Sequence, residues 1–323
     1  MVWMGLVSPE GPKLLLPSGG AQCIVRSSMR KTVAYILSTP YAGSHYLSLL
    51  MGSNSRAIHV GELNGLRKEK AKKESRECLV NRGEVLEGIG AENCDRVHDI
   101  IFSRIDPGIQ VLVDNSKRVS WAERFLGNDA FDKRYIHLIR DPRALVRRYA
   151  LRSHFRKVWR HRWRVFKAIP QLRPRIFLLP EPYVWAYYWL VQNRTISRFL
   201  RDNHLEHTVA AYRDLAINPA AEIQRLMEWL ELSYEPAQLE YWNFEHIGTQ
   251  KRDYEWVKEK KATFIDLRWQ SELPDNVQQT ISKDPLIGEY LSSLGLKFAD
   301  NGLTRNLERP LSTTSATGTV LRS

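Results

Sequence analysis

The feature that most constrains this chain is the stretch from Tyr35 to Leu50, which reads YILSTPYAGSHYLSLL. An apolar, β-prone run over residues 32–37 leads into a short turn rich in Ser, Pro and Gly, and the pattern is helix-periodic after the turn. A strand, a tight turn and a helix in this order aim backbone N–H groups at an anion. Gly43 lets the backbone approach a ligand closely, and Ser44 can cap the helix and donate to a phosphate oxygen.

The turn has the shape of a phosphate-binding loop but lacks the signature of nucleotide triphosphatases. That signature, G-x-x-x-x-G-K-[ST], places a Lys on the phosphates and a Ser or Thr on magnesium. In this chain Gly43 is followed by Ser-His-Tyr, and no Lys opens the helix. A kinase or another nucleotide triphosphatase with the same core fold remains an alternative, but its expected residues are missing. An ordinary strand-to-helix turn is the simplest alternative.

Length and composition set the class of protein. A chain of 323 residues, 43% of them hydrophobic, is long enough for one large α/β domain with additions or for two modest domains. No run approaches the ~18 apolar residues of a membrane span, and the N-terminus does not read as a secretory signal. Three cysteines without metal-like spacing fit a reducing compartment, so we expect a cytoplasmic protein.

Three segments divide the chain. Residues 1–30 are rich in Pro and Gly and predict a loosely ordered lead-in. Residues 31–298 carry the alternating patterns of a single α/β domain. Residues 299–323 are rich in Ser, Thr, Gly and Asn, which predicts a disordered tail.

The net charge of +12 is concentrated in one segment. Residues 142–180 contain twelve Lys and Arg and no Asp or Glu, and the rest of the chain is balanced with 36 basic and 36 acidic residues. Four aromatic residues are interleaved with the basic ones: Phe155, Trp159, Trp163 and Phe166. We therefore predict a basic helical insertion that attracts an anionic acceptor, a membrane surface or a nucleic-acid backbone.

The order of predicted elements favours a parallel sheet. Apolar strand-like runs alternate with helical patterns, and they span residues 32–37, 57–60, 109–113, 135–139 and 207–211. This alternation predicts an α/β fold with helices on both faces of the sheet. Ligands of such folds bind beyond the carboxyl ends of the strands, so the polar clusters that follow the strands are expected to converge.

Four polar segments follow these strands, and together they carry a family resemblance. They are TPYAGSH at 39–45, VDNSK at 113–117, HLIRDPRA at 137–144, and YRDLAINP at 212–219 with HIGTQKR at 246–252 behind it. Their order and spacing resemble the sulfotransferases that use 3′-phosphoadenosine 5′-phosphosulfate (PAPS), over about residues 33–252. The resemblance implies a P-loop-like parallel sheet and transfer of a sulfuryl group from PAPS, without a metal, to a hydroxyl or less readily an amine. The acceptor class stays open among small molecules, carbohydrates, lipids and peptides.

The resemblance also implies a set of donor-binding residues: Tyr41, Ala42, Gly43, Ser44, His45, Tyr46, Arg140, Arg148, Tyr212, Lys251 and Arg252. Within this set Arg140 would hold the 3′-phosphate, since a guanidinium offers paired charge-assisted hydrogen bonds. A salt bridge to Asp141 is its plain alternative. The chain departs from the family at Tyr41, where a Lys or Arg is usual, and at Arg148, where a Ser is usual. Tyr212 would pack near the adenine, or be simply a core aromatic.

Sulfuryl transfer to an alcohol needs a base and a cation near the leaving phosphate. By resemblance Glu62, just beyond the second strand, is the candidate base, and His45 and His59 compete with it. Lys117 or His45 is the candidate replacement for the cation missing at Tyr41. The plain alternatives are a helix-capping role for Glu62 and a surface charge for Lys117.

Overall fold

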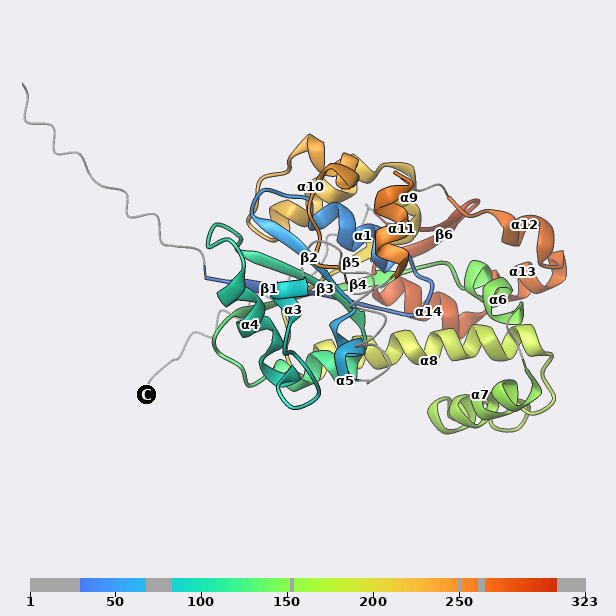
Figure 1. Cartoon of the computed structure of the whole chain (residues 1–323). Coiled ribbons are helices and arrows are strands. Elements are labelled where there is room, and N and C mark those ends of the chain that lie inside the picture. The colour runs from blue at the N-terminus through green and yellow to red at the C-terminus, as the bar shows by residue number, and fades with distance from the viewer. Residues whose placement is uncertain (1–29, 68–82, 152–153, 249–250, 261–264, 307–323) are drawn as a thin grey trace, which may run out of the picture.

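Five parallel strands form the central sheet of this computed structural model, in the order β2–β3–β1–β4–β5 (Figure 1). The strands are β1 (Thr32–Ser38), β2 (Ala57–Gly61), β3 (Val111–Lys117), β4 (Asp132–Ile139) and β5 (His207–Ala211). The structure describes residues 30–67, 83–151, 154–248, 251–260 and 265–306. The predicted α/β class with a parallel sheet between helices is confirmed.

Helices connect the strands and cover both faces of the sheet. The α-helices are α1 (Ser44–Met51), α3 (Gly83–Leu86), α4 (Val97–Arg104), α5 (Val119–Ala122), α6 (Pro142–Ala150), α7 (Phe155–Ala168), α8 (Glu181–Asp202), α9 (Tyr212–Ile217), α10 (Pro219–Trp229), α11 (Lys251–Lys258), α12 (Arg268–Glu272), α13 (Asp275–Lys283) and α14 (Pro285–Ser293). Short 3-10 turns are η1 (Leu63–Arg67), η2 (Cys94–Arg96), η3 (Glu123–Phe125), η4 (Pro170–Leu172) and η5 (Pro236–Asn243).

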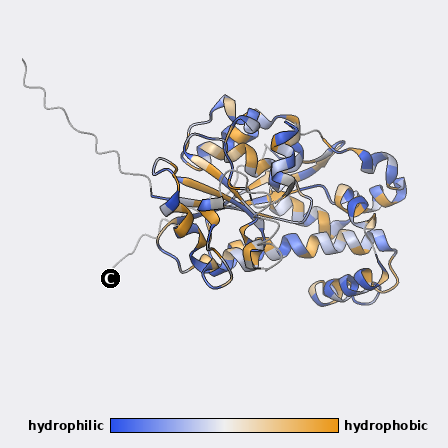
Figure 2. Ribbon diagram, in the orientation of Figure 1, coloured by the Kyte–Doolittle hydropathy of each residue, from blue (hydrophilic) through white to orange (hydrophobic). Residues whose placement is uncertain are grey.

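Successive side chains of the central strand β1 belong alternately to two separate cores, one on each face of the sheet. Val33, Tyr35 and Leu37 point to one face and pack with α4, α5 and the end of α8. Ala34 and Ile36 point to the other face and pack with α1 and α10. Successive strand residues face opposite sides, and a sheet covered on both sides needs apolar residues at every position. Hydrophobic residues accordingly concentrate along the strands (Figure 2).

Helix α8 is the longest element and organises the end of the molecule that holds the basic segment. Trp185 and Trp189 are fully buried in its core stripe, and α6, α7, α13 and α14 pack around it. Pro142 lies in the first turn of α6, and Asp141 caps this helix through the Arg143 N–H at 2.7 Å. The predicted basic helical segment therefore exists as α6, α7 and the turns that follow it.

Several predicted boundaries are wrong, and the fourth strand begins at Asp132 instead of residue 135. The third strand begins at Val111 and continues to Lys117, so residues 114–117 belong to the strand instead of following it. The predicted disordered tail is wrong for residues 299–306, because β6 (Leu296–Ala299) and β7 (Gly302–Arg305) form an antiparallel hairpin. Buried Leu303 anchors it, and the Asp214 carboxylate accepts a 2.7 Å hydrogen bond from the Thr304 hydroxyl.

Parts of two predicted segments lie outside the described residues. They are the lead-in up to residue 29 and the tail from residue 307. Within the residues that the structure describes, no helix combines the length and hydrophobicity needed to cross a bilayer.

Acid is expected to destabilise the fold through two buried histidines. Burial lowers the pKa of His137 from 6.5 to about 4, against a weaker opposing hydrogen bond to Asn193. Burial also lowers the pKa of His161 to about 4, and nearby Arg164 adds to the effect. These two histidines bind protons near pH 6.5 in the unfolded chain and only near pH 4 in the folded chain. The stabilisation that comes from burying them uncharged is therefore complete above pH 6.5 and is lost as the pH falls towards 4.

The expected loss is roughly 3 kcal/mol for His137 alone. Urea unfolding measured from pH 7.5 to pH 4 would show it as a falling free energy of unfolding. His161→Phe keeps a ring against α8 and removes one titrating group, so its profile should be shallower. A variant profile as steep as that of the parent chain would contradict the assignment to His161.

Candidate active site

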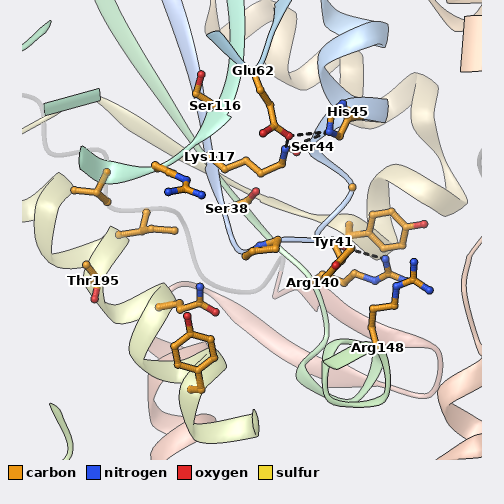
Figure 3. A pocket seen from close by; sticks show the side chains of 18 of the residues that line it. Ser38, Tyr41, Ser44, His45, Glu62, Ser116, Lys117, Arg140, Arg148 and Thr195 are labelled. Carbon is orange, nitrogen blue, oxygen red and sulfur yellow. Dashed lines mark hydrogen bonds and ion pairs between the residues drawn. The ribbon is translucent and has the colours of Figure 1, made fainter. Parts of the chain in front are cut away.

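A cavity of about 1310 Å³ opens at the carboxyl edge of the sheet (Figure 3). Residues at the ends of all five strands line it: Ser38 ends β1, Glu62 follows β2, Lys117 ends β3, Arg140 follows β4 and Tyr212 follows β5. Parallel strands bring their carboxyl ends to one edge, which is why residues this far apart in sequence meet here. The predicted convergence of the polar clusters is therefore found.

The loop between β1 and α1 forms one wall of the cavity. Gly43 is the N-cap of α1 with φ 99°, and Tyr41 also has a left-handed backbone with φ 69°. No side chain caps α1, so the predicted capping role of Ser44 is wrong. The buried hydroxyls of Ser38 and Ser44 have no hydrogen-bond partner among the described residues. Because buried polar groups are normally satisfied, these hydroxyls mark a place for a polar ligand.

Replacing Gly43 by Ala is expected to destabilise the loop. A left-handed backbone costs a residue with a Cβ about 1–2 kcal/mol. A Cβ on Gly43 would also lie 2.4 Å from Cδ2 of the Tyr212 ring, which packs directly on the glycine. Chemical denaturation of Gly43→Ala should show a decrease in the free energy of unfolding that is larger than the backbone cost alone. Adding Tyr212→Ala removes the clash, so the loss caused by Gly43→Ala should be smaller in that background; an equal loss would contradict the close packing.

Glu62, His45 and Lys117 are in direct contact beside the loop (Figure 3). The Glu62 carboxylate contacts His45 Nε2 at 2.9 Å and accepts a charged hydrogen bond from Lys117, and both contacts use Oε1. Oε2 of Glu62 has no partner in the described parts of the chain. Lys117 is only 13% exposed and ion-paired, so its plain alternative as a surface charge is wrong. Glu62 likewise does more than cap η1.

Asp253 holds the other side of His45, and no sequence pattern marks it as a site residue. Its Oδ1 lies 2.5 Å from His45 Nδ1, and its Oδ2 lies 3.5 Å from His59 Nε2. Burial opposes ionisation of Asp253, but the positive charges and hydrogen bonds of His45 and His59 lower its pKa. His59 is fully buried, contacts the Ser48 hydroxyl at 2.5 Å and does not line the cavity. Its place is therefore behind His45.

Asp114 fixes the backbone from which Lys117 projects. This buried carboxylate accepts hydrogen bonds from Trp121 Nε1 at 2.8 Å, from His98 at 3.0 Å and from the Ser116 N–H at 2.8 Å. Lys117 itself has φ 66°, a conformation uncommon outside glycine. Strained residues of this kind cluster at functional sites, where the surroundings hold them.

Arg140 reaches the cavity with its guanidinium already engaged. Nη1 donates to the Tyr41 carbonyl at 2.8 Å, Nη2 donates to Asp266 at 3.0 Å, and the group lies 4.4 Å from the centre of the Tyr212 ring. Asp141 pairs with Arg143 instead, so the alternative of an Arg140–Asp141 bridge is wrong. Asp266 lies in no recognisable sequence pattern, so its contact with Arg140 was not predicted.

Asp266 places a carboxylate between two guanidinium groups. Hydrogen bonds from Arg268 lower its pKa to about 2 against the effect of burial, and the charge of Arg140 adds to the shift. It is therefore ionised at neutral pH. An anion that binds Arg140 has to share or displace this carboxylate.

The remaining predicted donor-binding residues divide into three groups. Arg148 and Tyr46 line the cavity, and the Arg148 guanidinium lies 5.1 Å from the centre of the Tyr41 ring. Ala42 does not line it, because its side chain is buried in the core and its N–H donates to the Thr39 carbonyl at 3.3 Å. The side chains of Lys251 and Arg252, at the start of α11, lie outside the described part of the structure.

Comparison with known proteins finds similarity in structure only. No family model matches the sequence, and no curated protein matches it. The chain is similar to a sulfotransferase domain from the curacin biosynthetic pathway at 18% identity and a TM-score of 0.49, covering 82% of this chain and 99% of that one.

Two further solved structures are similar to the chain. One is a sulfotransferase domain from the Synechococcus PCC 7002 olefin synthase, at 17% identity and a TM-score of 0.38, covering 71% of this chain and 94% of that one. The other is sulfotransferase STF9 from Mycobacterium avium, at 16% identity and a TM-score of 0.38, covering 82% of this chain and 77% of that one. Likenesses this distant do not establish an activity, so the proposal below rests on the site.

Proposed function

We propose that the protein transfers a sulfuryl group from PAPS to a hydroxyl group of an acceptor. The observation that carries this proposal is the convergence at one strand edge of an anion-binding type of loop, Arg140, and the Glu62–Lys117 pair. Anion-binding groups and a base in one cavity are what transfer between a phosphate-bearing donor and an alcohol requires.

The residues of the cavity fit a donor with several anionic groups. The loop around Gly43 and the first turn of α1 direct N–H groups out of the helix N-terminus, which favours a 5′-phosphosulfate there. The unsatisfied hydroxyls of Ser38 and Ser44 supply further donors beside it. Arg140 would hold the 3′-phosphate, with Arg148 and Arg268 on the same wall. Tyr212 offers its ring to the adenine.

The reaction forms a bond from the acceptor oxygen to sulfur and breaks the bond from sulfur to the bridging phosphate oxygen, which leaves with the negative charge. Glu62 takes the proton of the acceptor hydroxyl through Oε2, since Oε1 is already held by His45 and Lys117. The ionised Asp253 fixes the His45 ring by its Nδ1 side. Lys117 holds Oε1 of Glu62 and brings a positive charge close to the loop, where Tyr41 cannot provide one.

The kinase alternative is less well supported by the same geometry. A phosphate-loop Lys directly follows the last Gly of the loop, and this chain has Ser44 after Gly43. His45, at the position of the magnesium-binding Ser or Thr, has both ring nitrogens in contact with carboxylates. An imidazole held in that way orients a base and does not clamp a triphosphate.

Binding of adenosine 3′,5′-bisphosphate in the presence of EDTA tests the donor half of the proposal. We expect this ligand to raise the Tm without a divalent ion and ATP with magnesium to raise it less, because no phosphate-loop Lys is present. Equal stabilisation by the two would argue for a nucleotide triphosphatase. Mass spectrometry of reactions with PAPS and a metabolite extract then identifies the acceptor by the mass gain of one sulfuryl group.

A further inference from the structure

Exposed apolar side chains gather in the basic segment. Among the described residues seven large hydrophobic side chains are exposed, and five of them belong to this segment: Leu151, Phe155, Trp159, Trp163 and Leu178. Phe155 is 82% exposed and Leu178 is 86% exposed. Scattered exposed hydrophobics are normal, but a local concentration marks an interaction surface. Most of this concentration falls on α7 and the turn after it, which lie below α8 in Figure 1.

One row of α7 side chains attaches the helix to the rest of the molecule. Residues three or four positions apart share a helix face. Val158, His161 and Val165 form the buried row, and the centre of the His161 ring lies 3.8 Å from that of Tyr188 on α8. The fold therefore uses this row for packing, and the other side chains of α7 are half-buried or exposed.

A second row is aromatic and consists of Phe155, Trp159, Trp163 and Phe166. Phe155 stacks on Trp159 with ring centres 6.3 Å apart, and Trp163 packs against Phe166 at 5.4 Å. Phe177, from the turn after α7, joins the two halves at 5.4 Å from Trp159 and 5.0 Å from Trp163. This aromatic row is one continuous strip, and its two tryptophans are 45% and 44% exposed.

A third row is basic and consists of Arg156, Arg160, Arg164 and Lys167. Each member follows a member of the aromatic row by one position, so the two rows run side by side about 100° apart. All four side chains are exposed, and none pairs with a carboxylate among the residues that the structure describes.

The charge excess of the segment is not all on the surface. Arg143 pairs with Asp141, and Arg147 pairs with Glu272 at 2.6 Å. Arg162 is held by the carbonyls of Ile176 and Leu179. These cations stabilise the fold, so on α7 the surface charge available to a partner is its basic row, and Arg173 and Arg175 in the turn after it are exposed as well.

We propose that α7 docks the protein on an anionic lipid bilayer surface. An amphipathic helix with Trp and Phe beside Lys and Arg lies in the plane of the interface, with its rings among the acyl chains and its cations on the headgroups. Nucleic acid would use the cations and the ring faces but has no partner for the exposed Leu178. Arg164 also lines the cavity, so docking brings the mouth of the cavity to the bilayer. This inference does not depend on sulfuryl transfer.

Sedimentation of the full chain with vesicles tests the proposal. We expect binding to vesicles of phosphatidylcholine with phosphatidylserine, and weaker binding to phosphatidylcholine alone. Arg156→Ala with Arg160→Ala should lower the affinity for the mixed vesicles by roughly tenfold or more. Trp159→Ala with Trp163→Ala should also lower it, including at high salt. The matched control is Arg198→Ala with Arg201→Ala on α8, two exposed arginines outside the basic segment, which should bind like the parent chain.

Circular dichroism and thermal unfolding establish that each variant is folded before binding is compared. Unchanged binding by both α7 variants, or no binding to either vesicle, overturns the proposal. Single-stranded RNA that binds at the same salt more tightly than the mixed vesicles overturns it in favour of nucleic acid. A concentration-dependent dimer that the tryptophan variant abolishes overturns it in favour of a second copy of this chain.

Discussion

Replacing Glu62 by Gln is expected to lower turnover by ~10²–10⁴-fold, the usual value of a general base, with little change in donor affinity. The substitution keeps the shape of the side chain and removes its basicity. Glu62 follows β2 at the edge of the cavity, and its Oε2 is the carboxylate oxygen without a partner among the described residues. Strands β3 and β1 lie between β2, which Glu62 follows, and β4, which Arg140 follows. The charge of Glu62 is therefore kept away from the proposed phosphate site at Arg140.

The histidines provide the controls for this prediction. His45→Asn should cause a smaller loss of turnover, because His45 positions Glu62 and already contacts Asp253. His59→Asn should leave turnover nearly normal and lower stability, since His59 is buried behind His45. Turnover, its pH profile and donor affinity would be measured for all three variants. Near-normal turnover of Glu62→Gln together with a collapse of His45→Asn would make His45 the base.

Replacing Arg140 by Ala is expected to weaken binding of adenosine 3′,5′-bisphosphate by ~2–5 kcal/mol, which is the cost of removing one partner from a buried charge pair. Arg140→Lys keeps the charge but loses the paired hydrogen bonds, so it should fall between the parent and the Ala variant. Isothermal titration calorimetry measures the three affinities. The exposed Arg198→Ala is the matched loss of one positive charge and should have no effect.

Replacing Asp266 is expected to change the affinity for the bisphosphate in the opposite direction. Its ionised carboxylate neutralises Arg140 and would repel a phosphate at the same place. Asp266→Asn should therefore bind the bisphosphate more tightly than the parent chain. Thermal unfolding of each variant separates this effect from damage to the loop, because Arg140 also holds the Tyr41 carbonyl. Unchanged affinity in both Arg140→Ala and Asp266→Asn would place the 3′-phosphate elsewhere.

Much of the fold could be predicted because its signals are local. The run into β1, the turn at Gly43 and the periodic start of α1 are each encoded within a few residues, as is the start of α6 at Pro142. Element boundaries were harder, since β3 extends through polar residues that Asp114 satisfies internally. The hairpin that begins at Leu296 was missed because its polar residues hide the two buried leucines, Leu296 and Leu303, that anchor it.

The sequence by itself determined which residues stand at the strand ends, because parallel strands place their carboxyl ends at one edge whatever the details of packing. Together with the family resemblance, this is why Glu62, Lys117 and Arg140 could be chosen in advance. Only the tertiary structure decided what these residues touch. Asp253 meets His45 across 208 positions and Asp266 meets Arg140 across 126, and no local pattern links the members of either pair. Such contacts depend on where loops return over the sheet, which is set by the packing of the whole chain.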